Sequence, residues 1–246
     1  GNWPAAAHEW QLAADRFHLL NDRTNYAIAL HNLAQARRQL GELTNAHGLL
    51  EQAAGVNRQL GRPADWWRNQ LALLQLEAQM RHTNALQNRF GELLPLAPGI
   101  PSRDVSAIFL NELGLWRQQQ GEFPQAADSF RQAREQFAAL GDEAGLATVE
   151  ANQARLLEAQ QDYPAAVARW NAALARFEAL GEPPEIARVL LGLGRTLLSA
   201  RQDLPRAEDL LRRAARNFEL LQAPDDRKTA LRLLVEIGRA SCRERV

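Results

Sequence analysis

The sequence predicts an all-α protein built as an α-solenoid of about five to six helix pairs. The first observation is a repeated phrase, seen most clearly in Gly121-Glu-Phe-Pro-Gln-Ala-Ala-Asp, whose copies start at residues 1, 41, 80, 121, 161 and 202. The spacings are 40, 39, 41, 40 and 41 residues, and a fixed period in this range is typical of stacked helical units. The second observation is that each period holds two apolar patterns of helical spacing, and no strand pattern competes with them.

The first predicted helix spans residues 4–20. Its apolar residues recur at steps of 4, 3, 4 and 3, on one stripe of an amphipathic helix: Ala6, Trp10, Ala13, Phe17 and Leu20. A second pattern runs from Thr24 to Leu40 and ends at Gly41, a residue suited to a helix C-terminal cap. Each period is therefore a helix pair, in which we call the helix before the repeated phrase helix A and the helix after it helix B.

The other periods extend this scheme along the chain. The predicted A helices occupy about residues 24–40, 64–80, 103–120, 143–160 and 184–201, and a sixth begins near Asp225. The predicted B helices occupy about residues 4–20, 44–60, 83–94, 124–140, 164–180 and 205–221. Local signals mark several helix starts: Pro63 with Asp65, Ser102, Asp142, and Pro183-Pro184 before Glu185.

One connection differs from the others. Residues 94–102 contain three prolines and a glycine, where the other B-to-A connections are short. This composition predicts a shortened B helix followed by a longer surface loop. The alternative is a hinge or a bend in the solenoid at this point.

Composition excludes several classes of site. The chain has 29 basic and 29 acidic residues, so its bulk charge does not indicate a nucleic-acid or anionic membrane surface. No apolar run approaches the roughly 20 residues of a membrane-spanning helix. The single cysteine, Cys242, excludes an intramolecular disulfide and a zinc site made of cysteines.

The two ends of the chain differ from the repeats. Residues 236–246 abandon the pattern and resemble a translated sequencing adapter, so we interpret residues 1–235 as a single solenoid and residues 236–246 as a non-native tail; the alternative is an ordinary basic tail. The chain begins with Gly in mid-repeat, and we therefore expect the solenoid to be truncated at both ends. We expect a soluble bacterial protein, and its localisation can be either the cytoplasm or the periplasm.

With the helix pairs aligned, the pattern resembles the tetratricopeptide repeat family in its longer form of about 40 to 42 residues per repeat. The copy from Ala107 matches the family motif with Leu110, Leu113-Gly114, Gly121, Phe123, Ala126, Phe130 and Ala133. In this motif small residues such as Gly114, Ala34, Ala154 and Gly194 let helices A and B approach closely, while Phe130 and Trp170 fill the gaps between repeats. The copy through Trp66 to Phe90 departs from the pattern, which leaves its packing in doubt.

The resemblance implies a right-handed superhelix whose concave groove, lined by A helices, binds an extended peptide or a partner helix. The residues that would face this groove and contact the peptide are His31, Gln35, Arg38, Trp67, Gln70, Asn111, Gln118, Arg155, Arg188 and Arg195. Amide side chains pair with a peptide backbone of any sequence, and arginine forks onto carboxylates, so the four arginines favour an acidic ligand. The alternative is that these arginines only solvate the helix surface.

The sequence contains none of the usual patterns for catalysis, metal binding or a cofactor. The five histidines form no i, i+4 pair on one helix, so we predict no metal site and no cofactor. Gly192-Leu-Gly194 lies within a predicted helix and follows no strand, which favours close helix packing over phosphate binding. Trp66 is predicted to be core and Trp67 to be a groove-facing aromatic residue.

Two hypotheses for function follow. The first is a non-enzymatic scaffold that binds a protein or an extended peptide, with no direct contact to nucleic acid. The second is a ligand- or peptide-sensing segment of a larger signalling or transcriptional regulator. Because helix 4–20 lacks a preceding A helix, we also expect self-association through the uncapped ends.

Overall fold

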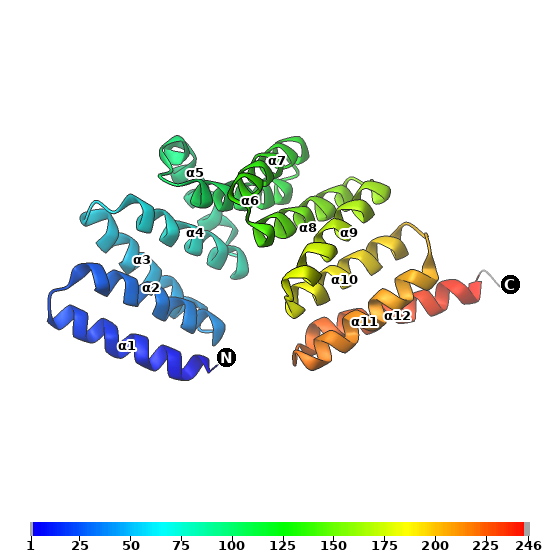
Figure 1. Ribbon diagram of the computed structural model, residues 1–246, viewed down its shortest axis with the longest axis horizontal. Helices are drawn as coiled ribbons and strands as arrows, with labels where there is room; N and C mark the ends of the chain where they lie inside the picture. Colours follow the sequence, from blue (N-terminus) through cyan, green and yellow to red (C-terminus); the bar gives the residue numbers. More distant parts are fainter. Residues whose placement is uncertain (1, 244–246) are drawn as a thin grey trace. The chain divides into compact units, whose positions relative to one another are not determined.

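The computed structural model describes the backbone of residues 2–243 and the side chains of residues 2–239. This part of the chain consists of α-helices and one short 3-10 helix (Figure 1), and consecutive helices pack against each other from α1 to α5 and from α7 to α12. The A helices are α2 (Arg23–Gln39), α4 (Pro63–Gln79), α6 (Arg103–Gln119), α8 (Glu143–Ala159), α10 (Pro183–Ser199) and α12 (Pro224–Arg243). The B helices are α1 (Trp3–Leu19), α3 (Leu43–Gln59), α5 (Thr83–Leu93), α7 (Phe123–Leu140), α9 (Tyr163–Leu180) and α11 (Leu204–Leu220). The predicted all-α solenoid of helix pairs is confirmed.

The chain divides into two compact units, residues 1–113 and 114–246, with the boundary inside α6. Each unit has its own core. In the first, Leu50, Leu73 and Leu76 belong to one buried cluster of α3 and α4. In the second, a larger cluster joins α8 to α12 around Trp170 and Phe218.

Local chemistry sets the helix ends. The repeated turn puts one residue in the left-handed region, with φ of 79° at Gly41 and 78° at Gly121, where an L side chain is disfavoured. Asp142 is a side-chain N-cap, since its carboxylate accepts a 2.8 Å hydrogen bond from the Gly145 N–H. These local signals explain why the predicted helix limits agree closely with the structure.

Small residues allow the helices of a pair to approach closely. A Cβ atom added at Gly114 would lie 2.5 Å from Cε1 of Phe130, and one added at Gly194 would lie 2.7 Å from Cγ of Leu211. The predicted role of these two glycines in helix packing is therefore confirmed. Gly192 allows a close approach between neighbouring pairs, because its added Cβ would lie 2.6 Å from Cζ2 of Trp170 on α9.

One segment differs from the prediction. Leu94–Gly99 forms the 3-10 helix η1 rather than a loop, because Pro95 and Pro98 fix φ near the value that a 3-10 helix requires. Helix α12 continues past residue 235 to Arg243, and Ile237 is buried in the core of the second unit. The last residues of the predicted tail, 244–246, lie outside the described part of the chain. Along the described helices, none combines the length and apolar character needed to cross a bilayer.

Candidate functional site: the A-helix faces

In the first unit, polar side chains link three successive A helices. Arg38 of α2 donates from Nε to Oε1 of Gln79 at 2.8 Å, and its Nη1 lies 3.5 Å from Oε1 of Gln75 on α4. Gln75 in turn donates from Nε2 to Oε1 of Glu112 on α6 at 3.0 Å. The A-helix face thus carries a continuous polar row, as recognition of a polar peptide backbone requires.

Glu112 is the titratable end of this row. Burial raises the pKa of its carboxyl group, against the opposing effects of the Gln75 hydrogen bond, the charge of Arg38 and a hydrogen bond from Asn111. The A-helix face of this unit therefore holds a carboxylate whose ionisation is costly in the folded protein.

A small pocket opens between α2 and α4, above α3. Its volume is about 130 Å³, and its lining combines apolar and polar residues: Ala27, Ile28, His31, Asn32, Asn57, Asp65, Arg68 and Asn69. Asn57 donates from Nδ2 to Oδ1 of Asn69 at 2.8 Å, and Nδ2 of Asn69 lies 2.9 Å from Nδ1 of His31. Asn57 and Asn69 are buried, so their amides are fixed in place.

In the second unit, the A-helix face carries three exposed arginines, Arg155 of α8 and Arg188 and Arg195 of α10. Arg195 pairs with Glu158 at 2.8 Å, and Arg188 pairs with Glu185. The three positive charges therefore exceed the two carboxylates paired with them.

Arg155 supplies the excess charge. Its guanidinium carbon lies 5.7 Å from the ring centre of Trp170, and its Nη1 donates to Oδ1 of Asn152 at 3.0 Å. Partial burial lowers the pKa of Arg155, and the charge of Arg195 lowers it further. The charges of Glu158 and Glu185 act in the opposite direction, but among the described side chains Arg155 forms no ion pair, so it is an oriented cation without a direct carboxylate partner.

The predicted peptide-contacting residues fall into three groups. Arg155, Arg188 and Arg195 are exposed, and His31, Gln35, Arg38 and Gln118 are half-buried. Trp67, Gln70 and Asn111 are buried. Little of the side chains in this last group is open to a ligand.

The rotation of α4 about its axis decides which of its side chains are buried. Trp67 is 3% exposed and packs edge-on against Phe109, with 5.5 Å between ring centres. The neighbouring Trp66, predicted to be core, is half-buried. Arg68, Asn69, Gln75 and Gln79, which are not among the predicted contacts, are α4 residues linked to the other A helices. The physical reason is that α4 is apolar around most of its circumference, so its pattern does not define one inward stripe.

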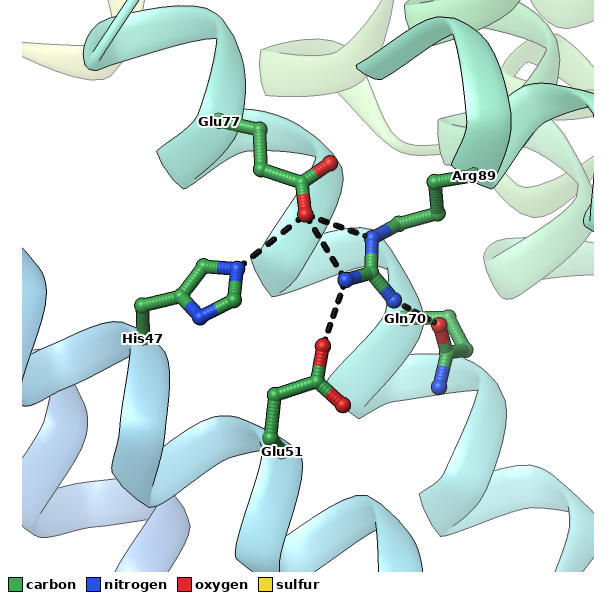
Figure 2. A network of polar contacts seen from close by, with 5 residues as sticks. All are labelled: His47, Glu51, Gln70, Glu77 and Arg89. Carbon is green, nitrogen blue, oxygen red and sulfur yellow. Dashed lines mark hydrogen bonds and ion pairs between the residues drawn. The ribbon is translucent and has the colours of Figure 1, made fainter. Parts of the chain in front are cut away.

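A second polar cluster joins helices α3, α4 and α5 (Figure 2). Arg89 donates to Oε1 of Glu77 from Nε at 2.9 Å and from Nη2 at 2.7 Å, and from the same Nη2 to Oε1 of Glu51 at 2.6 Å. Its Nη1 donates to Oε1 of Gln70 at 2.7 Å, which explains why Gln70 points inward. Nε2 of His47 lies 3.1 Å from Oε1 of Glu77.

This cluster has the composition of a metal site but not its charge balance. One ligand atom from each of His47, Glu51 and Glu77 lies within 4.8 Å of the others. Arg89 bonds to both carboxylates, as Figure 2 shows, and so already supplies the positive charge that a metal ion would bring. Burial lowers the pKa of Arg89, but the hydrogen bonds and charges of Glu77 and Glu51 outweigh it and raise that pKa overall. We interpret the cluster as an ion-pair network that locks three helices together.

Sequence reasoning missed this network. One signal was available, because His47 and Glu51 lie four residues apart on the same helix and therefore share a face. Their partners Glu77 and Arg89 lie 26 or more residues away in sequence, on helices whose rotation the sequence did not define.

Comparison with known proteins supports the assignment of the repeats. A family model for the tetratricopeptide repeat matches residues 104–178 and 145–219, and a second model for the same repeat matches residues 29–64. No curated protein sequence matches the chain.

Several solved structures share the fold. The crystal structure of BtubC (BKLC) from P. vanneervenii has a TM-score of 0.71 and 19% identity, covering 90% of this chain and 93% of that one. A Rap protein complexed with Competence and Sporulation Factor has a TM-score of 0.68 and 16% identity, covering 97% and 71%. Bacillus thuringiensis PlcR in complex with the peptide PapR7 and DNA has a TM-score of 0.69 and 15% identity, covering 83% and 73%. From its helix pairs, its period and these matches, the chain belongs to the tetratricopeptide repeat family.

Proposed function

We propose that this protein is a non-enzymatic scaffold whose A-helix faces bind an extended segment of a partner protein. The observation that carries the proposal is Arg155, an exposed guanidinium oriented by Trp170 and Asn152 without a carboxylate partner among the described residues. Two proteins of similar fold support this class, since PlcR was solved with the peptide PapR7 and a Rap protein with Competence and Sporulation Factor. The partner segment is acidic, because it neutralises the excess positive charge of the A-helix face in the second unit.

The test uses two labelled synthetic peptides of equal length, one alternating Glu with Leu and the other alternating Lys with Leu. Fluorescence anisotropy should show binding of the acidic peptide alone. Replacing Arg155 by Ala should weaken it by about tenfold, the equivalent of one charge-assisted hydrogen bond.

Arg131→Ala is the control, because Arg131 is an exposed arginine on α7, a B helix. It should leave the affinity unchanged. Equal losses in the two variants, or equal binding of the basic peptide, would refute the assignment to the A-helix face.

A sensing segment of a larger regulator is the second candidate. The similarity to PlcR favours it, because PlcR was solved with both a peptide and DNA. The test is to read the coding DNA across both ends of this chain. An adjoining ATPase or DNA-binding domain would favour the regulator, and a gene that encodes repeats alone would favour the scaffold.

The surface of α1 supports self-association as a further part of the proposal. Trp3 is 41% exposed and Trp10 is 37% exposed, and neighbouring Leu12 adds to the exposed apolar surface. We expect light scattering to show a mass that rises with protein concentration, and the variant with both tryptophans replaced by Ser to stay monomeric. A wild-type mass that stays monomeric over the same range would contradict this expectation.

A further inference from the structure

The hydrogen bonds beside the pocket between α2 and α4 form a chain from Asn57 through Asn69 to His31, in which each residue donates to the next. Asn57 donates to Asn69 at 2.8 Å, and the Nδ2 group of Asn69 can only donate, so Nδ1 of His31 at 2.9 Å accepts from it. In a neutral imidazole with an accepting Nδ1, the proton is on Nε2. The two asparagines thus fix His31 as a donor through Nε2–H.

The surroundings of His31 keep it neutral. Burial lowers its pKa, and the positive charge of Arg68 lowers it further, while Asp65 acts in the opposite direction. Arg68 and Asp65 are the charged groups in the pocket lining, and α2 and α3 contribute only uncharged side chains there. The neutral ring agrees with the hydrogen-bond direction, since a protonated His31 would place two donors against each other.

The other groups define the ligand. Arg68 and Asp65 form an ion pair at 3.1 Å, so the side chains that line the pocket carry no net charge; from outside the lining, Arg62 also pairs with Asp65 at 2.6 Å. The His31 Nε2–H donates and the Asp65 carboxylate accepts, which suits a neutral group that carries both a carbonyl and an N–H. A volume of about 130 Å³ holds roughly four water-sized groups, at about 30 Å³ each, and so one small side-chain head.

We propose that this pocket binds the carboxamide of an Asn or Gln side chain of the partner segment. The carboxamide oxygen accepts from Nε2–H of His31, its NH₂ group donates to Asp65, and its methylene groups contact Ala27 and Ile28. This inference rests on the proposed binding of a partner segment along the A-helix face, and it adds a neutral amide requirement in the first unit to the acidic preference of the second.

The first test needs no ligand. In ¹⁵N NMR spectra of the full chain, the neutral ring of His31 should carry its proton on Nε2. Asn69→Asp preserves an acceptor for Asn57 but presents a carboxylate to His31, so the ring proton should move to Nδ1 and the pKa of His31 should rise. A wild-type neutral ring protonated on Nδ1 would overturn the assignment.

The second test measures binding with propionamide as the probe and propionate as its charged counterpart. The Ile28 methyl resonances report on pocket occupancy. Propionamide should shift them saturably, and propionate should bind at least about tenfold more weakly, because it has no N–H group to donate to the Asp65 carboxylate. Equal affinity for the two probes, or no saturable shift with propionamide, would overturn the proposal.

Two substitutions of His31 distinguish the loss of its Nε2–H donor from a loss of folding. In His31→Asn the amide oxygen accepts from Asn69 but no donor reaches the pocket, so propionamide binding should weaken about tenfold. His31→Gln places an amide N–H near the Nε2 position and should retain most of the binding. The control is His8→Asn on the exposed surface of α1, which should change nothing.

These outcomes separate the inference from the proposed function. If propionamide fails to bind while the acidic peptide still binds through Arg155, the amide pocket is wrong and the scaffold proposal stands. If His31→Asn binds propionamide as tightly as wild type, His31 is not the donor and the inference falls.

Discussion

Gly114 shows how one missing side chain sets the distance between two helices. An added Cβ would lie 2.5 Å from Phe130, a buried side chain that has no free space to move into. We predict that Gly114→Ala lowers the free energy of unfolding by about 1–3 kcal/mol, as overpacking does in close-packed cores. Urea unfolding measures this difference.

The chain offers a matched control in Gly48. It lies inside helix α3, where an added Cβ would meet nothing within 4 Å. Gly48→Ala should therefore raise the free energy of unfolding by about 0.5–1 kcal/mol, since alanine favours the helix more than glycine does. Destabilisation in both variants would mean that packing against Phe130 is not the cause.

Glu112 gives a prediction about pH. Its pKa is raised in the folded protein, first by burial, so the protonated form is favoured by folding. This contribution to stability is complete below the unfolded-state pKa and is lost as the pH rises through the folded-state pKa. We expect Glu112→Gln, which mimics the protonated form and still accepts from Gln75, to melt at a higher temperature than wild type at pH 7.

The two proteins should differ less as the pH falls. Thermal melts at several pH values between 4 and 7 check this. A Glu112→Gln variant that is less stable than wild type at pH 7 would show that attraction to Arg38 outweighs the cost of burial.

At the scale of helices, the Arg89 network should hold α3, α4 and α5 together. Glu77 is buried, and Arg89 is its main cationic partner among the described side chains. Removing one partner of a buried ion pair leaves the other charge uncompensated, so Arg89→Ala should cost about 3–5 kcal/mol of unfolding free energy. Denaturant unfolding measures the loss.

A double variant identifies the cause of that loss. Adding Glu77→Gln to Arg89→Ala removes the unpaired charge and should restore part of the stability. Arg131→Ala, which breaks exposed ion pairs on α7, should have little effect. If the double variant is less stable than Arg89→Ala, the penalty comes from lost packing rather than from a buried charge.

At the scale of the whole molecule, the two units have separate cores, and repeat proteins unfold locally when one part is weakened. We predict that Arg89→Ala lowers hydrogen-exchange protection in α3, α4 and α5. The helices that form the core around Trp170, from α8 to α12, should keep their protection. Mass spectrometry of exchanged peptides measures both regions in one experiment. Equal loss of protection along the chain would show that the protein unfolds as a single cooperative unit.

The sequence by itself determined the family, the helix pairs and their limits. These depend on signals that act within one or two turns of chain, such as Gly121 at positive φ and Asp142 at a helix N-terminus, and on a period long enough to be unmistakable. The roles of Gly114 and Gly194 followed as well, because the repeat places each opposite a large residue of the paired helix.

Only the tertiary structure decided which side of each helix faces a neighbour. A shift of one residue rotates a helical position by about 100°, and α4 is apolar on most sides, so the tryptophans at 66 and 67 could not be assigned from the pattern. The Arg89 network and the Asn57–Asn69–His31 relay join residues 12 to 38 positions apart. Contacts of this kind depend on helix rotation and on long-range packing, and neither leaves a periodic trace in the sequence.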